Sequence, residues 1–210
     1  MIAELTLPPS GLLGYEEAMP HPNLSLIDGF DQRVLDSYPG QLYLRTHLNS
    51  IHRMFYAPDD DPASARLQTE TKFMNVSVVA DSVSGMNWIA PRFAFQETDP
   101  PADDILGARL RGKYWGAQVI TYRPFIRMIL EFNYWRAHQS GPNVLPVPEF
   151  RKGIVYPTIA PDAKSSKDLD AELVSLAIKG IKALVESTRA FHGLGEQRPI
   201  ITNVFGTAHA

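Results

Sequence analysis

The sequence of 210 residues contains no cysteine. This absence excludes disulfide bridges, thiol catalysis and zinc sites built from thiolates. The chain also lacks a run of about 20 apolar residues, the length that a membrane-spanning helix requires, so we expect no membrane association. Positive charge is not in excess, because 20 Lys and Arg stand against 23 Asp and Glu, a formal net charge of −3. Attraction to nucleic acid by overall charge is therefore not expected.

The common catalytic and metal-binding motifs are missing as well. His47 and His52 are five residues apart, about 140° around a helix, so they cannot hold one metal from a single face. The glycine-rich run Gly193–Glu196 follows a predicted helix, whereas a dinucleotide-binding loop follows a strand. We therefore expect no catalytic residue, no metal and no cofactor, and we expect each of the six histidines to be hydrogen-bonded or exposed.

The most informative segment runs from Asp99 to Trp135. Asp99 can cap a helix, and Pro100 and Pro101 suit its first turn. Pro124 lacks a backbone donor and disfavours the α region for the preceding residue, so it should break or kink the helix. Before it, apolar residues recur at spacings of four, four and three, as they do on one helical face: Leu106, Leu110, Tyr114 and Ala117.

Two glycines lie inside this predicted helix, Gly112 and Gly116. Each glycine lowers helix stability by roughly 1 kcal/mol relative to alanine. We therefore predict that the two glycines form a groove that allows another helix to approach closely. Arg109 and Lys113 share one face and Arg111 points roughly the opposite way. We expect all three to be solvated or ion-paired, with their aliphatic stems packed over apolar neighbours.

The aromatic residues of the segment allow two interpretations. Core packing is the simpler one, and a ligand pocket between helices is the other. The residues are Tyr114, Trp115, Tyr122, Phe125, Phe132, Tyr134 and Trp135.

The rest of the chain also favours helices. Residues 1–39 are predicted to form an irregular arm, and a helical pattern begins at Gly40, with apolar residues at Leu44, Leu48, Ile51 and Phe55. A polar helix is predicted over 61–72. The valines of the segment 73–89, Val76, Val78, Val79 and Val83, would suit a strand by propensity. We predict a helix there, because Val76, Val79, Val83 and Met86 fall at helical spacings.

The C-terminal third begins with a proline-rich connection over 138–165. Ser165–Asp168 resembles a capping box. The helix that follows should bury Leu169, Leu173, Leu176, Gly180 and Leu184, and Gly193 or Gly195 should stop it. A last apolar helical pattern begins near Asn203 and is cut at Ala210, so we expect the domain to be incomplete at its C-terminus.

Several segments together resemble a known family. They resemble, in the same order, parts of the regulatory (middle homology) region of fungal-specific transcription factors of the zinc-cluster (Zn2Cys6) class. The matching segments are Leu7–Gly11 with Tyr15–Glu17 and Met19–Pro20, Tyr43–His52, Ala108–Ala117 with Tyr122–Phe125, Ile181–Leu184 with Ser187–Thr188, and Thr202–Ala210. The six cysteines of the zinc cluster itself have no counterpart in this chain, so the part of the family that reads DNA is missing.

The resemblance implies a nuclear regulatory domain that is not an enzyme. It would control transcription through protein partners of the transcription machinery, through the missing remainder of the same factor, or through a small-molecule effector. It would not bind DNA specifically by itself. The residues singled out as structural or pocket-lining are Arg109, Gly112, Lys113, Tyr114, Trp115, Gly116, Arg123 and Pro124.

Two hypotheses therefore remain open. One is the regulatory region just described. The other is a helical enzyme or small-molecule-binding domain that uses the aromatic cluster between Tyr114 and Trp135. Both share one expected fold: a single, incomplete domain over 1–210, in which an irregular arm over 1–39 is followed by an all-α bundle, with six to eight helices in total.

Overall fold

A computed structural model describes residues 15, 18, 20, 22–56, 76–138 and 154–195, apart from the side chains of residues 53 and 54. The described residues are mostly helical, which confirms the all-α prediction. The α-helices are α1 (Gln32–Phe55), α3 (Val76–Ser82), α4 (Met86–Ile89), α5 (Ile105–His138) and α6 (Ala171–Arg189). Short 3-10 turns accompany them: η2 (Leu24–Leu26), η3 (Val83–Gly85), η4 (Pro91–Phe93), η5 (Ser166–Asp168) and η6 (His192–Leu194).

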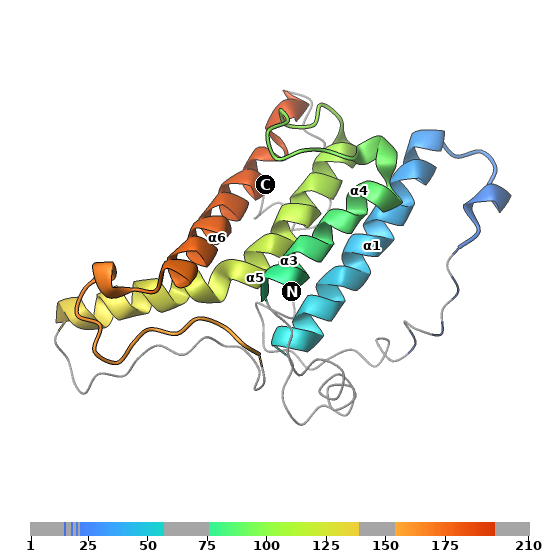
Figure 1. Cartoon of the computed structure of the whole chain (residues 1–210). Coiled ribbons are helices and arrows are strands. Elements are labelled where there is room, and N and C mark those ends of the chain that lie inside the picture. The colour runs from blue at the N-terminus through green and yellow to red at the C-terminus, as the bar shows by residue number, and fades with distance from the viewer. Residues whose placement is uncertain are drawn as a thin grey trace.

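The long helices lie side by side (Figure 1). The helix α6 is at one edge and packs mainly against α5, and α5 in turn packs against α1. The short helices α3 and α4 fit between α5 and α1. Side chains from all these helices form one buried cluster whose largest fully buried members include Phe55, Phe125, Leu44, Ile51 and Met86.

The helix α1 begins earlier than its apolar pattern indicates. It starts at Gln32 rather than Gly40, because the Asp31 carboxylate accepts a hydrogen bond of 2.7 Å from the backbone N–H of Arg33. Residues 32–39, which the sequence places in the irregular arm, are therefore helical, and Pro39 lies inside the helix.

Tertiary packing explains why the helix tolerates Pro39. A Cβ at the adjacent Gly40 would lie 2.9 Å from the Cβ of Ala90 and 3.1 Å from a methyl group of Leu110. This part of α1 is thus pressed against α4 and α5, and the packing outweighs the local cost of a proline in a helix.

The prediction for residues 73–89 is confirmed over the described part. The residues at helical spacing, Val76, Val79, Val83 and Met86, are all buried, and they lie on α3, η3 and α4 in succession. The β-branched composition therefore did not decide the structure; the apolar spacing did.

The helix α5 begins at Ile105, not at Asp99 with its two prolines. Its cap is Asp104, whose carboxylate accepts hydrogen bonds of 3.0 Å from the N–H groups of Leu106 and Gly107. Asp99 instead accepts from the N–H of Gln96 at 2.8 Å and closes a turn before the helix. The prediction of Asp99 as the cap was thus wrong by five residues. Asp104 is held in the capping position by a second partner as well, because its carboxylate also forms an ion pair of 2.5 Å with Arg33.

The capping box at Ser165–Asp168 is confirmed, but it caps the short turn η5. The helix α6 has its own cap, Asp170, and ends at Arg189, before either glycine that was expected to stop it. Its buried residues are Leu173, Leu176, Ala177, Gly180 and Ala183, whereas Leu184 is 46% exposed, against the prediction.

Several predictions fall outside the described residues. These are the polar helix over 61–72, residues 139–153 of the proline-rich connection, the pattern from Asn203, and most of the arm before residue 22. The described part of the connection, 154–165, contains no helix.

Candidate functional site

The eight candidate residues all lie on α5, which runs between α1 and α6 (Figure 1). They do not converge on one cavity, because they point in different directions around the helix. Their contacts fall into four groups: the basic residues, the glycines, the aromatic residues and the proline.

Lys113 joins α5 to α1. Its side chain is half-buried, and its ammonium group donates a hydrogen bond to the Gln41 side chain. Burial lowers the pKa of Lys113, and the nearby positive charges of Arg109 and Arg45 lower it further. The expectation of a solvated or ion-paired head is therefore wrong for Lys113, whereas Arg109 is exposed as expected.

Arg111 holds the segment that precedes α5. Its guanidinium carbon lies 4.8 Å from the centre of the Phe95 ring, and the group donates a hydrogen bond to the carbonyl of Pro100. A cation over an aromatic face is attracted by the ring's charge distribution. Arg111 is thus a packing residue rather than a free cation of the surface.

The two glycines differ in their surroundings. A Cβ at Gly112 would lie 2.9 Å from the ring of Phe191, in the turn that follows α6, which confirms close packing there. A Cβ at Gly116 would meet no atom within 4 Å, so the prediction of a packing glycine is wrong at that position.

Gly180 of α6 makes a close contact with α5. A Cβ there would lie 3.0 Å from the Cβ of Tyr122 and 2.8 Å from the Cδ1 of Ile126. The groove that was predicted on α5 therefore lies on α6, and only one glycine forms it.

The aromatic residues pack as a core over most of the segment. Tyr114 and Trp115 are buried and meet edge to face, with ring centres 5.1 Å apart, and Phe95 adds a second edge contact to Tyr114 at 5.0 Å. Tyr122, Phe125 and Phe132 are also buried. Tyr134 and Trp135, however, are 56% and 47% exposed, so the last two members lie outside the core.

Pro124 does not break α5. The helix continues to His138, and Figure 1 shows a bend where the green half passes into the yellow half. A proline leaves the carbonyl four residues earlier without its helical donor, and here that carbonyl belongs to Ile120. The hydroxyl group of Tyr56, from the end of α1, donates a hydrogen bond of 2.5 Å to it.

Arg123 lies beside this bond. Its guanidinium carbon is 5.8 Å from the centre of the Tyr56 ring. Burial raises the pKa of Tyr56 to about 12, although the charge of Arg123 acts in the opposite direction. The hydroxyl group is therefore protonated at neutral pH and remains a donor. Sequence spacing alone could not reveal this contact, since the two residues that it joins are 64 positions apart.

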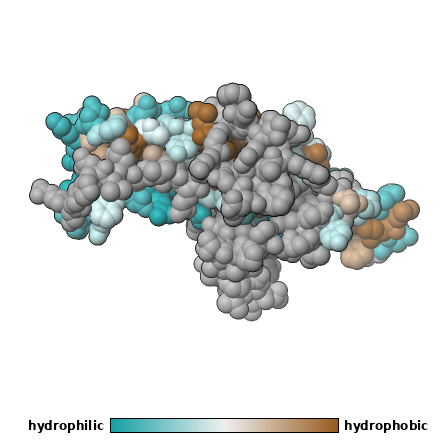
Figure 2. All heavy atoms as spheres, turned by 90° about the horizontal axis from the view of Figure 1, so that it is seen from below, coloured by the Kyte–Doolittle hydropathy of each residue, from teal (hydrophilic) through white to brown (hydrophobic). Residues whose placement is uncertain are grey.

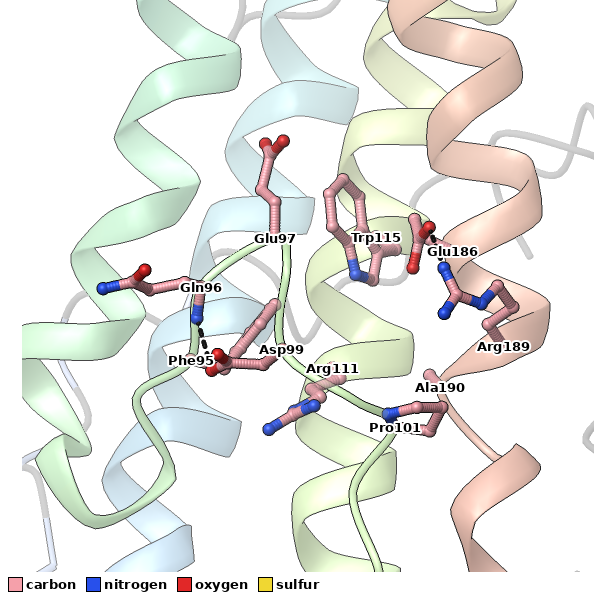
Figure 3. A pocket seen from close by; sticks show the side chains of 10 residues that line it. All are labelled: Phe95, Gln96, Glu97, Asp99, Pro101, Arg111, Trp115, Glu186, Arg189 and Ala190. Carbon is pink, nitrogen blue, oxygen red and sulfur yellow. Dashed lines mark hydrogen bonds and ion pairs between the residues drawn. The ribbon is translucent and has the colours of Figure 1, made fainter.

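A shallow crevice lies where the 95–101 segment meets α5 and α6 (Figure 3). Its volume is about 10 Å³, enough for roughly one water molecule. The charged groups around it are largely paired. The guanidinium group of Arg189 forms an ion pair of 2.7 Å with the Glu186 carboxylate, and Lys182 forms an ion pair with Glu97. Trp115 lies at one wall, and Arg111 at another (Figure 3). The crevice is too small for an organic substrate.

A larger depression, of about 480 Å³, opens between η2, the first turns of α1, and η4. Leu35, Pro39 and Ile89 line it, and an ion pair of 2.9 Å between Arg92 and Asp36 lies beside them. Seen from below, hydrophobic atoms gather at the end of the molecule that carries η2 (Figure 2). None of the candidate residues reaches this depression.

His47 contacts a serine in a way that could suggest catalysis. Its Nε2 atom lies 3.1 Å from the Ser82 hydroxyl and 3.2 Å from the carbonyl of Val79. The same hydroxyl donates to that carbonyl at 2.7 Å. A ring nitrogen whose N–H donates to a carbonyl cannot take a proton from serine, so the three groups form a bridge between α1 and α3.

Within the described ranges, no three His, Asp or Glu side chains come together as metal ligands. None of the described helices combines the length with the apolarity that a bilayer crossing needs. In comparisons of the chain with family models, curated proteins and solved structures, no match was found.

Proposed function

We propose that this chain is the regulatory region of a fungal transcription factor of the zinc-cluster class. In this role it acts through protein or effector contacts in the nucleus, and a separate module reads the DNA. The proposal starts from the order of the sequence segments that resemble this family, and the fold adds support to it.

The supporting observation is the way in which these segments meet. The segment Tyr43–His52 lies on α1, Ala108–Ala117 and Tyr122–Phe125 lie on α5, and Ile181–Leu184 lies on α6. These helices pack in the order α1, α5, α6. The resembling segments whose structure is described are thus far apart in the sequence but lie in one packed unit, which supports the proposal.

The polar groups of the segments serve this packing. Lys113 is bonded to Gln41 on α1, and Tyr56 is bonded to the Ile120 carbonyl beside Arg123. In the proposed role, this packed unit would be a scaffold whose surface contacts partners. The competing hypothesis of an aromatic ligand pocket has less support, because Tyr114 and Trp115 pack directly on each other.

A reporter experiment tests the proposal. The chain is fused to an unrelated DNA-binding module with an activating segment, and transcription from the cognate reporter is measured in fungal cells. We expect the chain to change reporter output several-fold relative to the module alone. Unchanged output from a folded fusion protein at equal nuclear concentration would contradict the proposal.

Matched variants sharpen this test. Lys113→Met removes the hydrogen bond to Gln41, and Arg109→Met removes an exposed charge from the same face of α5. We expect only Lys113→Met to weaken the effect on transcription. Equal effects of both variants would indicate that overall charge, rather than the packed unit, controls the output.

A further inference from the structure

Three cations gather where α1 and α5 pack together. Arg109 and Lys113 are one turn apart on α5, and Gln41 and Arg45 are one turn apart on α1. The two pairs meet, because the Lys113 ammonium group donates a hydrogen bond to the Gln41 side chain. Burial lowers the pKa of Lys113, and the charges of Arg109 and Arg45 are close enough to lower it further. We name Arg45, Arg109 and Lys113 the basic cluster.

Among the described residues, no carboxylate neutralises the basic cluster. Arg45 and Arg109 form no ion pair there, and Lys113 bonds only to a neutral amide. A shortage of acids is not the reason, because the chain holds 23 Asp and Glu against 20 Lys and Arg. A half-buried ammonium group without a counter-ion is unfavourable, and a bound anion would offset this cost. Other cations of the described part are each paired with a carboxylate: Arg33, Arg92, Arg127, Lys182 and Arg189.

Gly116 leaves room beside the basic cluster. It follows Lys113 by three residues and Arg109 by seven, so the three residues share one side of α5. A Cβ at Gly116 would meet no atom within 4 Å, so no packing contact explains a glycine inside this helix. Gln118, which bonds to the Ala80 carbonyl of α3, is half a turn around α5 from Arg109. The room at Gly116 therefore lies on the side of α5 that faces away from α3.

The polar groups beside this room are donors. Arg45 and Arg109 carry guanidinium N–H groups, and the Lys113 ammonium group has further N–H groups besides the one bonded to Gln41. The oxygen of Gln41 accepts that bond, so its amide nitrogen is a further donor. A phosphate group brings more acceptor oxygens and more negative charge than a carboxylate does. We propose that the basic cluster binds a phosphate group beside Gly116, as free phosphate or on a small organic molecule.

The extent of the basic cluster favours a single phosphate group over a nucleic acid. Asp103, which is exposed, and Asp104 lie within two turns of Arg109 on α5. A nucleic-acid backbone carries a negative charge at every nucleotide and needs a longer basic track. Along α5 it would meet these two carboxylates, and the net charge of −3 would oppose its approach as well.

Titration of the purified full chain with inorganic phosphate, at constant ionic strength, tests the site. Calorimetry should show saturable binding with a Kd on the order of 1 mM, which is within reach of so small a ligand. Arg45→Gln and Arg109→Gln should each weaken binding about tenfold, the loss expected for one charge-assisted hydrogen bond. Lys167→Gln is the matched control: it removes an exposed charge from η5 and should bind phosphate as the wild type does.

Gly116→Leu separates binding from folding. Its side chain fills the room beside the basic cluster, so phosphate binding should be lost at concentrations that saturate the wild type. The melting temperature without phosphate should not fall, because leucine favours a helix more than glycine does and no atom lies within 4 Å of its Cβ. A lower melting temperature together with unchanged phosphate binding would contradict the proposal.

The inference goes beyond the proposed function, since phosphate binding is not assumed to control transcription. The reporter experiment tests the packing of Lys113 on Gln41, whereas the titration tests the charges of the basic cluster on the isolated protein. The two proposals can therefore fail separately.

Phenyl phosphate and duplex DNA, titrated in the same way, identify the source of the phosphate group. Weaker binding of phenyl phosphate than of inorganic phosphate assigns the site to free phosphate, and equal or tighter binding assigns it to an organic phosphate. Three results would overturn the proposal: no saturable binding of either compound, a loss of binding in Lys167→Gln as large as in Arg109→Gln, or tighter binding of DNA, per phosphate group, than of inorganic phosphate.

Discussion

The hydrogen bond between Tyr56 and the Ile120 carbonyl can be tested by removing it in two ways. Tyr56→Phe deletes the hydroxyl group and leaves the carbonyl without a protein donor. A partly buried carbonyl that loses its donor costs about 1–3 kcal/mol of unfolding free energy. Pro124→Ala restores the helical N–H, which can donate to the same carbonyl. After that change, the hydrogen bond from the Tyr56 hydroxyl should contribute less to the free energy of unfolding, because the carbonyl has a second donor.

The expected result is a coupling between the two positions. If Tyr56→Phe costs about 2 kcal/mol in the wild-type chain, it should cost roughly 1 kcal/mol less in the Pro124→Ala background, because the carbonyl keeps one donor. The change that Pro124→Ala causes by itself does not enter this difference. In a chain of this length, 1 kcal/mol corresponds to about 2–4 °C in the melting temperature.

Urea unfolding of the wild type, both single variants and the double variant gives the coupling energy. Tyr43→Phe is the control, because the Tyr43 hydroxyl also donates from α1 to a carbonyl, that of Ser82, which no proline has deprived of a donor. Its cost should be the same in the wild-type chain and in the Pro124→Ala background. Coupling that is zero for Tyr56, or equally large for Tyr43, would refute the reasoning.

Three further predictions concern glycine packing, capping and pH. Gly116→Ala should stabilise the chain by up to about 1 kcal/mol, whereas Gly180→Ala should destabilise it because its Cβ would press on Tyr122; thermal melts in which both changes stabilise would contradict the α5–α6 contact. Asp104→Ala should cost about 1–2 kcal/mol by removing the cap of α5, a loss that Asp104→Asn should largely avoid in urea unfolding. Burial lowers the pKa of His47 below 6.5, although the hydrogen bond to the Val79 carbonyl acts in the opposite direction. The contribution of His47 to the free energy of unfolding should therefore be fully present above pH 6.5 and be lost as the pH falls below it, because the unfolded chain takes up the proton first. His47→Gln should make the free energy of unfolding less dependent on pH in this range.

The apolar spacing was sufficient to predict the helices of the core. It predicted α3 and α4 through Val76, Val79, Val83 and Met86, although valine favours strands. Spacing failed at helix ends, where polar contacts between distant segments decide. Asp104 caps α5 in part because Arg33, 71 residues away, binds it, and no local pattern contains that information.

The candidate site was predicted less well than the fold. The sequence located the residues on one helix but could not supply their partners. Lys113 was expected to be solvated and is bonded to Gln41, and Gly116 was expected to be packed and faces open space. Pro124 was expected to break or kink α5; the helix continues with a bend, and the Tyr56 hydroxyl donates to the carbonyl that the proline leaves without a helical donor. For Lys113 and Pro124 the deciding partner comes from α1, and for Gly116 no neighbouring atom lies within 4 Å of where its Cβ would be.

The hydrogen bond between the Tyr56 hydroxyl and the Ile120 carbonyl also couples the local unfolding of α1 to that of α5. Fraying of the end of α1 removes Tyr56, and the middle of α5 then loses one of its hydrogen bonds at the same moment. The amide protons around Ile120 should therefore exchange with solvent at the rate set by the release of α1, rather than by local fluctuation of α5 alone. The Tyr56 hydroxyl group thus adds a link between α1 and α5 at the position where Pro124 removes a helical hydrogen bond.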